Sequence, residues 1–162
     1  MEAVSFTHDA TLPADPATVL ATLTEESFVR EALAALGADV REVTVEGTRT
    51  TARYSVPTQG IPPAFAKFVG DRVEVLDVRT WTAEGDGASG TVVVTTKLFG
   101  RDVRLDGHRR LEAAPEGTRV SSNGHSSVDA PIVGRQAEKG VDELAVVVLS
   151  READALTRRL GG

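Results

Sequence analysis

The sequence predicts an α+β fold in which a curved, seven-stranded antiparallel sheet wraps around a long C-terminal helix. Three observations lead to this prediction. Two short helical segments follow the first strand, and the chain ends in one amphipathic helix. Six further strands lie between them, and the connections among the last four are too short for a crossover helix. A helix of about 29 residues is about 43 Å long, and seven adjacent strands span about 33 Å. The last helix can therefore cross the whole sheet and bury its apolar stripe there.

Local patterns place the first elements. Residues 2–8 alternate along the chain in the manner of a strand. A first helix is predicted after Asp15, a candidate N-cap, with Pro16 at its first position. A second helix is predicted from Glu25, because acidic residues favour a helix N-terminus, and Gly37 is expected to end it.

The period then changes to two, which is typical of strands. Residues 38–57 predict a hairpin with its turn at 46–48, and the prolines that follow interrupt the sheet. Turn residues separate four longer strands, predicted at about 72–83, 89–99, 101–113 and 118–128. Apolar residues at helical spacing then predict a helix over 132–160.

Composition limits the function classes. The length favours a single domain over residues 1–162. The absence of cysteine excludes disulfides and cysteine nucleophiles and fits a reducing cytoplasm. The net charge of −6 disfavours nucleic acid as a partner, and no run approaches the roughly 18 apolar residues of a membrane span. A cytoplasmic monomer or weak dimer is expected.

Four stretches of sequence, together with the order of elements, carry a family resemblance. They are "TLTEESFVREALAALG", Trp81 in the fourth strand, "LDGHRRLEAAPEGTRV" and "SVDAPIVGRQAE". The order of elements resembles the helix-grip fold of the START and Bet v 1-like (SRPBCC) superfamily. The stretches themselves are similar to an actinobacterial family called domain of unknown function 2505.

In that family the last helix opens with proline, Val-Gly and a glutamate. Pro131, Val133, Gly134 and Glu138 match this pattern, and Glu152 matches a second glutamate further along. The family often ends the helix with aromatic residues, whereas this chain has "LTRRL". The departure puts an aromatic lining at the far end of any cavity in doubt.

The resemblance implies a hydrophobic cavity between the sheet and the last helix. The superfamily includes lipid-transfer domains, polyketide cyclases and hormone-binding proteins. The leading hypothesis is therefore binding of a small hydrophobic molecule, such as a lipid, an isoprenoid or a polyketide, with no cofactor. A cyclase or dehydratase-like enzyme and a protein-interaction domain with a vestigial cavity are the alternatives, because one fold supports many functions.

Small side chains on the last strand support a cavity, since large ones would fill it. The parity of Val120 and Val128 favours an inward face for the small residues between them. Trp81 is expected to anchor the core, whereas Phe65 and Phe68 could form either a lid or a packed insert. The candidate cavity residues are Tyr54, Phe65, Phe68, Trp81, Leu105, Gly107, Ser122, Gly124, Val141, Leu144 and Val148.

Neither catalytic nor metal-ligating residues are assigned. The surroundings of His108 and His125 are typical of an exposed sheet face, and His8 has no partner at ligand spacing. Asp77 and Arg79 share the parity of Trp81, so they could form a buried ion pair, but a bulge that returns them to solvent is the favoured interpretation.

The two glutamates of the last helix are fourteen residues apart, so they lie on roughly one face. The favoured interpretation places Glu138 and Glu152 on a solvated face, paired with Arg135 and Arg151.

Overall fold

The computed structural model describes residues 5–57, 72–98, 100–129 and 134–161. It confirms the α+β fold with a seven-stranded antiparallel sheet and a long C-terminal helix. The strands are β1 (Phe6–Leu12), β2 (Asp39–Glu46), β3 (Arg49–Pro57), β4 (Arg72–Glu84), β5 (Gly87–Leu98), β6 (Arg101–Ala114) and β7 (Gly117–Val128). The helices are α1 (Pro16–Leu23), α2 (Glu26–Ala34) and α4 (Gly134–Leu160).

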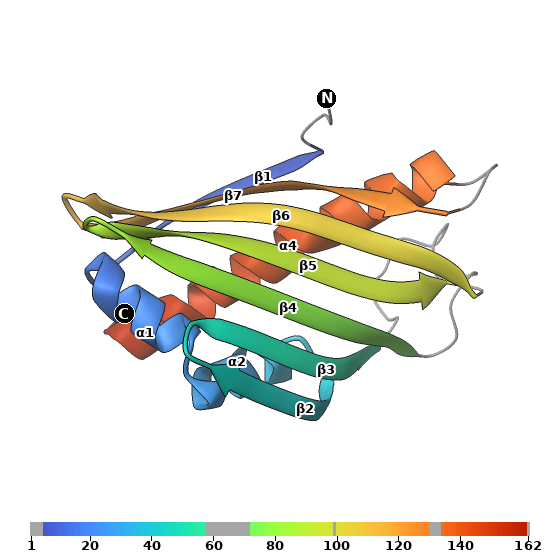
Figure 1. The fold of residues 1–162 in the computed structure, drawn as a ribbon, viewed down its shortest axis with the longest axis horizontal. Helices are drawn as coiled ribbons and strands as arrows, with labels where there is room; N and C mark the ends of the chain where they lie inside the picture. The colour runs from blue at the N-terminus through green and yellow to red at the C-terminus, as the bar shows by residue number, and fades with distance from the viewer. Residues whose placement is uncertain (1–4, 58–71, 99, 130–133, 162) are drawn as a thin grey trace.

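The strand order is β1-β7-β6-β5-β4-β3-β2, so the meander predicted from the short connections is confirmed. The first strand pairs with the last one, which leaves β1 and β2 at the two edges of the sheet. In Figure 1, α4 runs diagonally behind the sheet and ends beside α1. Because α4 lies on one face only, the inward side chains of the strands decide how well that face is filled.

Most element boundaries agree with the prediction, and the first strand differs most. It runs from Phe6 to Leu12, four residues beyond the predicted end at residue 8, because the alternation of buried and exposed side chains continues up to Leu12. Residues 2–4 of the predicted strand lie outside the described residues. Asp15 has the extended backbone of an N-cap, but its carboxylate accepts from the Thr18 hydroxyl and caps no backbone N–H. Gly37 ends the second helical segment with a φ of 74°.

One end of the interior is densely filled, and we call it the packed end. It lies where α1, α2 and the C-terminal part of α4 meet the sheet, and it is built around Leu12, Val19, Phe28, Leu111 and Leu156. Each of these five side chains is at most 1% exposed. Close packing of this kind is the normal state of a protein interior.

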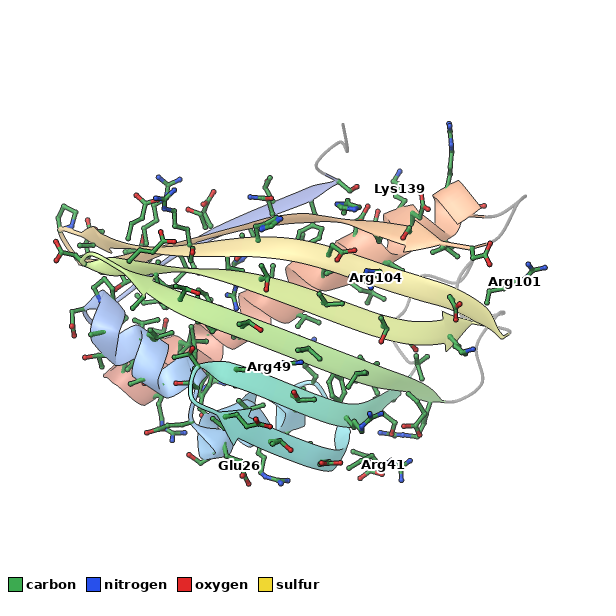
Figure 2. All side chains as sticks on the ribbon, in the orientation of Figure 1. Glu26, Arg41, Arg49, Arg101, Arg104 and Lys139 are labelled. Carbon is green, nitrogen blue, oxygen red and sulfur yellow. The ribbon has the colours of Figure 1, made fainter. Side chains whose placement is uncertain are left out.

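The surface of the molecule carries exposed charged side chains. Figure 2 shows Glu26, Arg41, Arg101 and Lys139 at the periphery of the molecule. Arg104 on β6 is likewise exposed and pairs with Asp106 two residues further along the strand. Pairs of this exposed kind contribute little to stability, so they contrast with the charges described below.

Candidate functional site

The inward face of β7 carries small side chains, as the parity of Val120 predicted. Ser122, Gly124 and Ser126 are all buried, and the alternate residues are more exposed. On the neighbouring strand, Gly107 is the register partner of Gly124. Two adjacent strands thus offer little side-chain volume at the same level of the sheet.

A cavity of about 110 Å³ lies at this level, between the sheet and α4. Its walls are largely apolar and come from both layers: Phe6, Val92, Val94, Leu105, Val148 and Leu149. Polar groups reach it from four strands, namely Tyr54, Asp77, Arg79, Arg109 and Ser122. An apolar space with a few convergent polar groups is the usual form of a small-molecule site.

Four charged side chains meet beside this cavity, and we call them the charge network: Asp77 and Arg79 from β4, Arg109 from β6 and Glu152 from α4. Arg79 donates from Nε to Asp77 Oδ1 at 3.0 Å and from Nη2 to Asp77 Oδ2 at 3.2 Å. Its Nη1 donates to Glu152. The bidentate pair with Asp77 fixes the plane of the guanidinium.

Arg109 holds the other oxygen of Glu152. Its Nη2 donates to Glu152 Oε1 at 2.6 Å, and its Nε donates to the Ser122 hydroxyl at 3.0 Å. The guanidinium also lies over the Trp81 ring, with its carbon 5.5 Å from the ring centre, a favourable cation–π arrangement. Nη1 of Arg109 is buried and has no hydrogen-bond partner among the described residues.

The electrostatics of the network follow from burial and charge pairing. Burial alone would raise the pKa of Glu152, but the Arg109 and Arg79 guanidiniums outweigh it and lower the pKa to about 2. Burial and the neighbouring Asp77 carboxylate raise the pKa of the Tyr54 hydroxyl above its ordinary value. At neutral pH, Glu152 is therefore ionised and Tyr54 is protonated.

The sequence of this chain matches a known protein family. A family model described as a protein of unknown function, DUF2505, matches residues 7–160. The chain belongs to the DUF2505 family. None of the curated protein sequences matches it.

Solved structures share the fold of this DUF2505 chain. The protein TTHA0849 from Thermus thermophilus is 19% identical with a TM-score of 0.61, covering 95% of this chain and 97% of that one. A START superfamily protein from Mycobacterium smegmatis is 14% identical with a TM-score of 0.51, covering 95% and 94%. Ara h 8.0201 is 16% identical with a TM-score of 0.50, covering 93% and 95%. These matches confirm the START and Bet v 1-like helix-grip fold.

Five of the predicted cavity residues of this DUF2505 chain line the 110 Å³ cavity: Tyr54, Leu105, Gly107, Ser122 and Val148. Trp81 lines a smaller space of about 40 Å³ on the α2 side of the charge network, and Asp77 and Arg79 line both spaces. Phe65 and Phe68 lie outside the described residues. That any of these residues binds a ligand stays a prediction.

Three further candidates do not line the cavity. Gly124 is buried, and a Cβ at its position would lie 2.8 Å from the Phe6 ring, so the space there is already filled. Val141 packs with Phe6, Leu105 and Leu149 instead of opening onto the cavity. Leu144 is half-buried and lines neither space.

The expectation that a bulge returns Asp77 and Arg79 to solvent is wrong. The pairing of β4 with β3 and β5 runs through both residues without a register shift, so they stay on the inner face with Trp81. Asp77 is only 5% exposed. Hydrogen bonds from Arg79 compensate the cost of burying the carboxylate.

The solvated face predicted for the two glutamates of α4 is also wrong. Glu152 is 6% exposed and pairs with Arg79 and Arg109 on the sheet. Glu138 is half-buried, and its Oε2 accepts the backbone N–H of Val128 at 3.0 Å. Both carboxylates face the sheet because guanidinium and backbone donors lie there.

The sequence interpretation missed Arg109, which it grouped with the exposed surroundings of His108. A signal was present: Arg109 has the parity of Gly107 and Leu111, both of which are buried. His108 is exposed, as expected, and His8 and His125 are half-buried. Within the described ranges, no group of histidines and carboxylates could hold a metal ion, and no helix is long and apolar enough to span a membrane.

Proposed function

We propose that the chain binds a small, mainly apolar ligand in the cavity between the sheet and α4. The observation that carries this proposal is the cavity itself, because a space of about 110 Å³ remains open there, whereas the space beside Trp81 and Phe28 measures only about 40 Å³. Gly107 and Ser122 leave that space because their side chains are small. On β6 the same inward face carries the larger Leu105 and Leu111, two and four residues from Gly107. The proposal agrees with what the resemblance to the START and Bet v 1-like superfamily implies, a hydrophobic cavity between the sheet and the last helix, and the fold shared with these structures supports it.

The volume limits what the ligand can be. An engineered protein cavity of about 150 Å³ binds benzene, so a cavity of about 110 Å³ suits a group of roughly five or six non-hydrogen atoms. A lipid, an isoprenoid or a polyketide would place only one end in the space described here. The buried part of the ligand is therefore short, whatever its total length.

The enzyme hypothesis requires ionisable groups that face the cavity, and Asp77 and Arg79 now meet that condition. Their chemistry nevertheless favours binding over proton transfer. Glu152, with its pKa near 2, holds no proton to donate at neutral pH and is a weak base. Both oxygens of Asp77 already accept from Arg79. We therefore place the cyclase or dehydratase activity second.

The protein-interaction hypothesis requires an apolar surface patch. Over the described part of the chain, Val147 is the one large hydrophobic side chain that is exposed. A single exposed valine is normal for a protein surface and marks no interface. The described surface thus gives this third hypothesis no support.

A matched pair of substitutions on α4 tests the proposal. Val148 lines the cavity, and its neighbour Val147 is 44% exposed. Val148→Trp should fill the cavity, whereas Val147→Trp adds the same side chain outside it. The wild type and both variants are purified from the native host. Their bound small molecules are measured by native mass spectrometry and by extraction.

We expect a bound apolar molecule with the wild type and with Val147→Trp, and its loss with Val148→Trp. Thermal unfolding of both variants shows whether each one is folded. The proposal is wrong if the wild type carries no small molecule, or if folded Val148→Trp retains as much as the wild type.

A further inference from the structure

Two spaces inside the protein share one ion pair. The larger one, the cavity of about 110 Å³ between the sheet and α4, we call the main cavity, and the smaller one, of about 40 Å³ beside α2, we call the α2 space. Among the described residues, Asp77 and Arg79 alone line both spaces. The two spaces are therefore neighbours, and these two side chains lie between them.

Arg79 reaches from the sheet to the helix. Its Nε and Nη2 donate to the two oxygens of Asp77 on the same strand, at 3.0 and 3.2 Å, and its Nη1 donates to Glu152 on α4. Hydrogen bonds to a carboxylate on each side hold the guanidinium in this position. We call Arg79 with its two carboxylate partners, Asp77 and Glu152, the partition.

The α2 space has the same character as the main cavity. Small side chains line it, Ala52 from β3 and Ala32 from α2, together with the larger apolar side chains of Phe28 and Leu33. Apolar walls therefore lie on both sides of the partition. If the partition were absent, an apolar ligand in the main cavity could extend into the α2 space.

The stability of the fold does not by itself require an ion pair here. Replacing a buried ion pair by apolar side chains of similar volume is often neutral or stabilising. A ligand that crossed the partition, in contrast, would have to separate Arg79 from Glu152 and leave buried charges with fewer partners, which is costly. The ion pair thus opposes a long ligand more than it stabilises the empty protein.

We infer that the partition limits the length of the buried part of the ligand, so that Arg79 determines specificity for short apolar groups. Such a group fits the main cavity beside Leu105 and Val148, and the guanidinium of Arg79 stops it before the α2 space. A wrong ligand is rejected because it would leave a desolvated charge unpaired. The inference rests on the proposed function and names the structural feature that excludes ligands with a longer buried part.

Two aromatic probes of different length test the partition. Benzene has six non-hydrogen atoms, which is within the size that suits the main cavity, whereas naphthalene has ten. Each probe is titrated into the full chain and followed by NMR of the methyl groups. The methyl groups of Leu105 and Val148 report on the main cavity, and those of Ala32 and Ala52 report on the α2 space.

A double substitution opens the partition without leaving a net charge behind. Asp77→Val with Arg79→Ala removes both members of one ion pair, and Glu152 keeps its bond to Arg109. The matched control is Arg104→Ala with Asp106→Val. Arg104 and Asp106 form the same bidentate pair two residues apart on one strand, but on the outer face of the sheet.

In the wild type, we expect naphthalene to bind at least about tenfold more weakly than benzene. Benzene should shift the methyl signals of the main cavity more than those of the α2 space. The double variant should bind naphthalene at least about tenfold more tightly than the wild type does, and naphthalene should then shift the methyl signal of Ala52. The control variant should behave as the wild type.

A second variant gives a test that does not depend on the folding of the double variant. Ala52→Leu fills the α2 space, and it should change the affinity for benzene by less than about twofold, because the partition separates the two sites. A larger loss of affinity in folded Ala52→Leu would show that the ligand already reaches the α2 space, and it would overturn the inference. Thermal unfolding shows whether each variant is folded.

The remaining outcomes separate this inference from the proposed function. Naphthalene binding as tight as that of benzene in the wild type would overturn the partition but keep the apolar site, as would an unchanged naphthalene affinity in the folded double variant. An equal gain in the control variant would also overturn it. If benzene binds to none of these proteins, the proposed function fails and the inference fails with it.

Discussion

The two parts of the interior beneath α4 differ in how completely they are filled. At the packed end, Leu111 from the sheet and Leu156 from the helix are each 1% exposed. Beside the cavity, the corresponding leucines are Leu105 on β6 and Leu149 on α4, which are 9% and 8% exposed. The same two elements therefore build both parts, and only their side chains differ.

The charge network lies between these two parts of the interior. Glu152 lies one turn after Leu149 and one turn before Leu156 on α4, and Arg109 lies between Gly107 and Leu111 on β6. The charges thus occupy the boundary between the filled and the open part. Their polar groups contact the cavity, while the packed end stays apolar.

Removing the carboxylate of Glu152 should destabilise the protein strongly. Glu152→Ala leaves Arg109 without a carboxylate partner and Arg79 with Asp77 alone. Removing one partner of a buried ion pair costs about 3–5 kcal/mol. Urea unfolding of Glu152→Ala should show a loss of this size, and the exposed Glu143→Ala on the same helix should change stability by less than about 0.5 kcal/mol. Similar small losses in both variants would show that the network does not couple sheet and helix.

A pair of leucines on β6 tests the packing difference directly. Leu111→Ala should cost about 3–5 kcal/mol, because a fully buried leucine leaves a new cavity when it is truncated. Leu105→Ala should cost about 1–2 kcal/mol less, because its side chain already borders empty space and has fewer contacts to lose. Both losses in free energy of unfolding are obtained from the urea midpoints, provided that the m-value is the same in each variant. A larger loss for Leu105→Ala would mean that the cavity is filled in solution.

Lowering the pH should reduce the free energy of unfolding by protonating Glu152. Its folded-state pKa of about 2 lies below the ordinary 4.5, so its contribution is complete above pH 4.5 and is lost as the pH falls toward 2. The difference corresponds to about 3 kcal/mol at neutral pH. Urea unfolding from pH 7 to pH 2.5 should show a smaller loss in Glu152→Gln than in the wild type. Parallel profiles for the two proteins would contradict the assigned role of this carboxylate.

The comparison also shows what the sequence predicts well. Short turns fixed the antiparallel order, and the alternation of residues 118–128 placed Ser122 and Gly124 on the inner face, because a strand has a strict period of two. Strand parity likewise put Asp77 beside Trp81 on one face. The prediction departed from parity there, in favour of a bulge, because the apolar Leu76 and Val78 lie on the opposite parity.

The network itself depends on pairing across distant elements. Arg109 and Glu152 are forty-three residues apart, so the sequence around either residue does not predict that they pair. Helical spacing shows which face carries Glu152 but not that two guanidiniums meet it. Once strand order and register are known, Arg79 and Arg109 fall on the inner face of the same sheet opposite α4, and the burial of Glu152 follows from their charge.

Two glycines at one level of the sheet test whether the space beside each of them is open or filled. Gly107 and Gly124 are register partners. A Cβ at Gly124 would overlap the backbone carbonyl oxygen of Asp106 and lie 2.8 Å from the Phe6 ring, so Gly124→Ala should destabilise by about 1–3 kcal/mol. A Cβ at Gly107 meets nothing closer than 3.3 Å, the carbonyl oxygen of Asn123.

Gly107→Ala should therefore change the free energy of unfolding by less than about 1 kcal/mol, but it should reduce the amount of bound apolar molecule, because the new methyl group projects toward Val92 and Leu105 in the lining of the cavity. Thermal unfolding of both alanine variants, and native mass spectrometry of both proteins purified from the native host, measure the two effects. An unchanged amount of bound molecule in Gly107→Ala would place the ligand elsewhere, and a stable Gly124→Ala would mean that the backbone of β6 and the Phe6 ring both shift to admit the methyl group. The two glycines thus distinguish a residue kept small for ligand space from one kept small for packing.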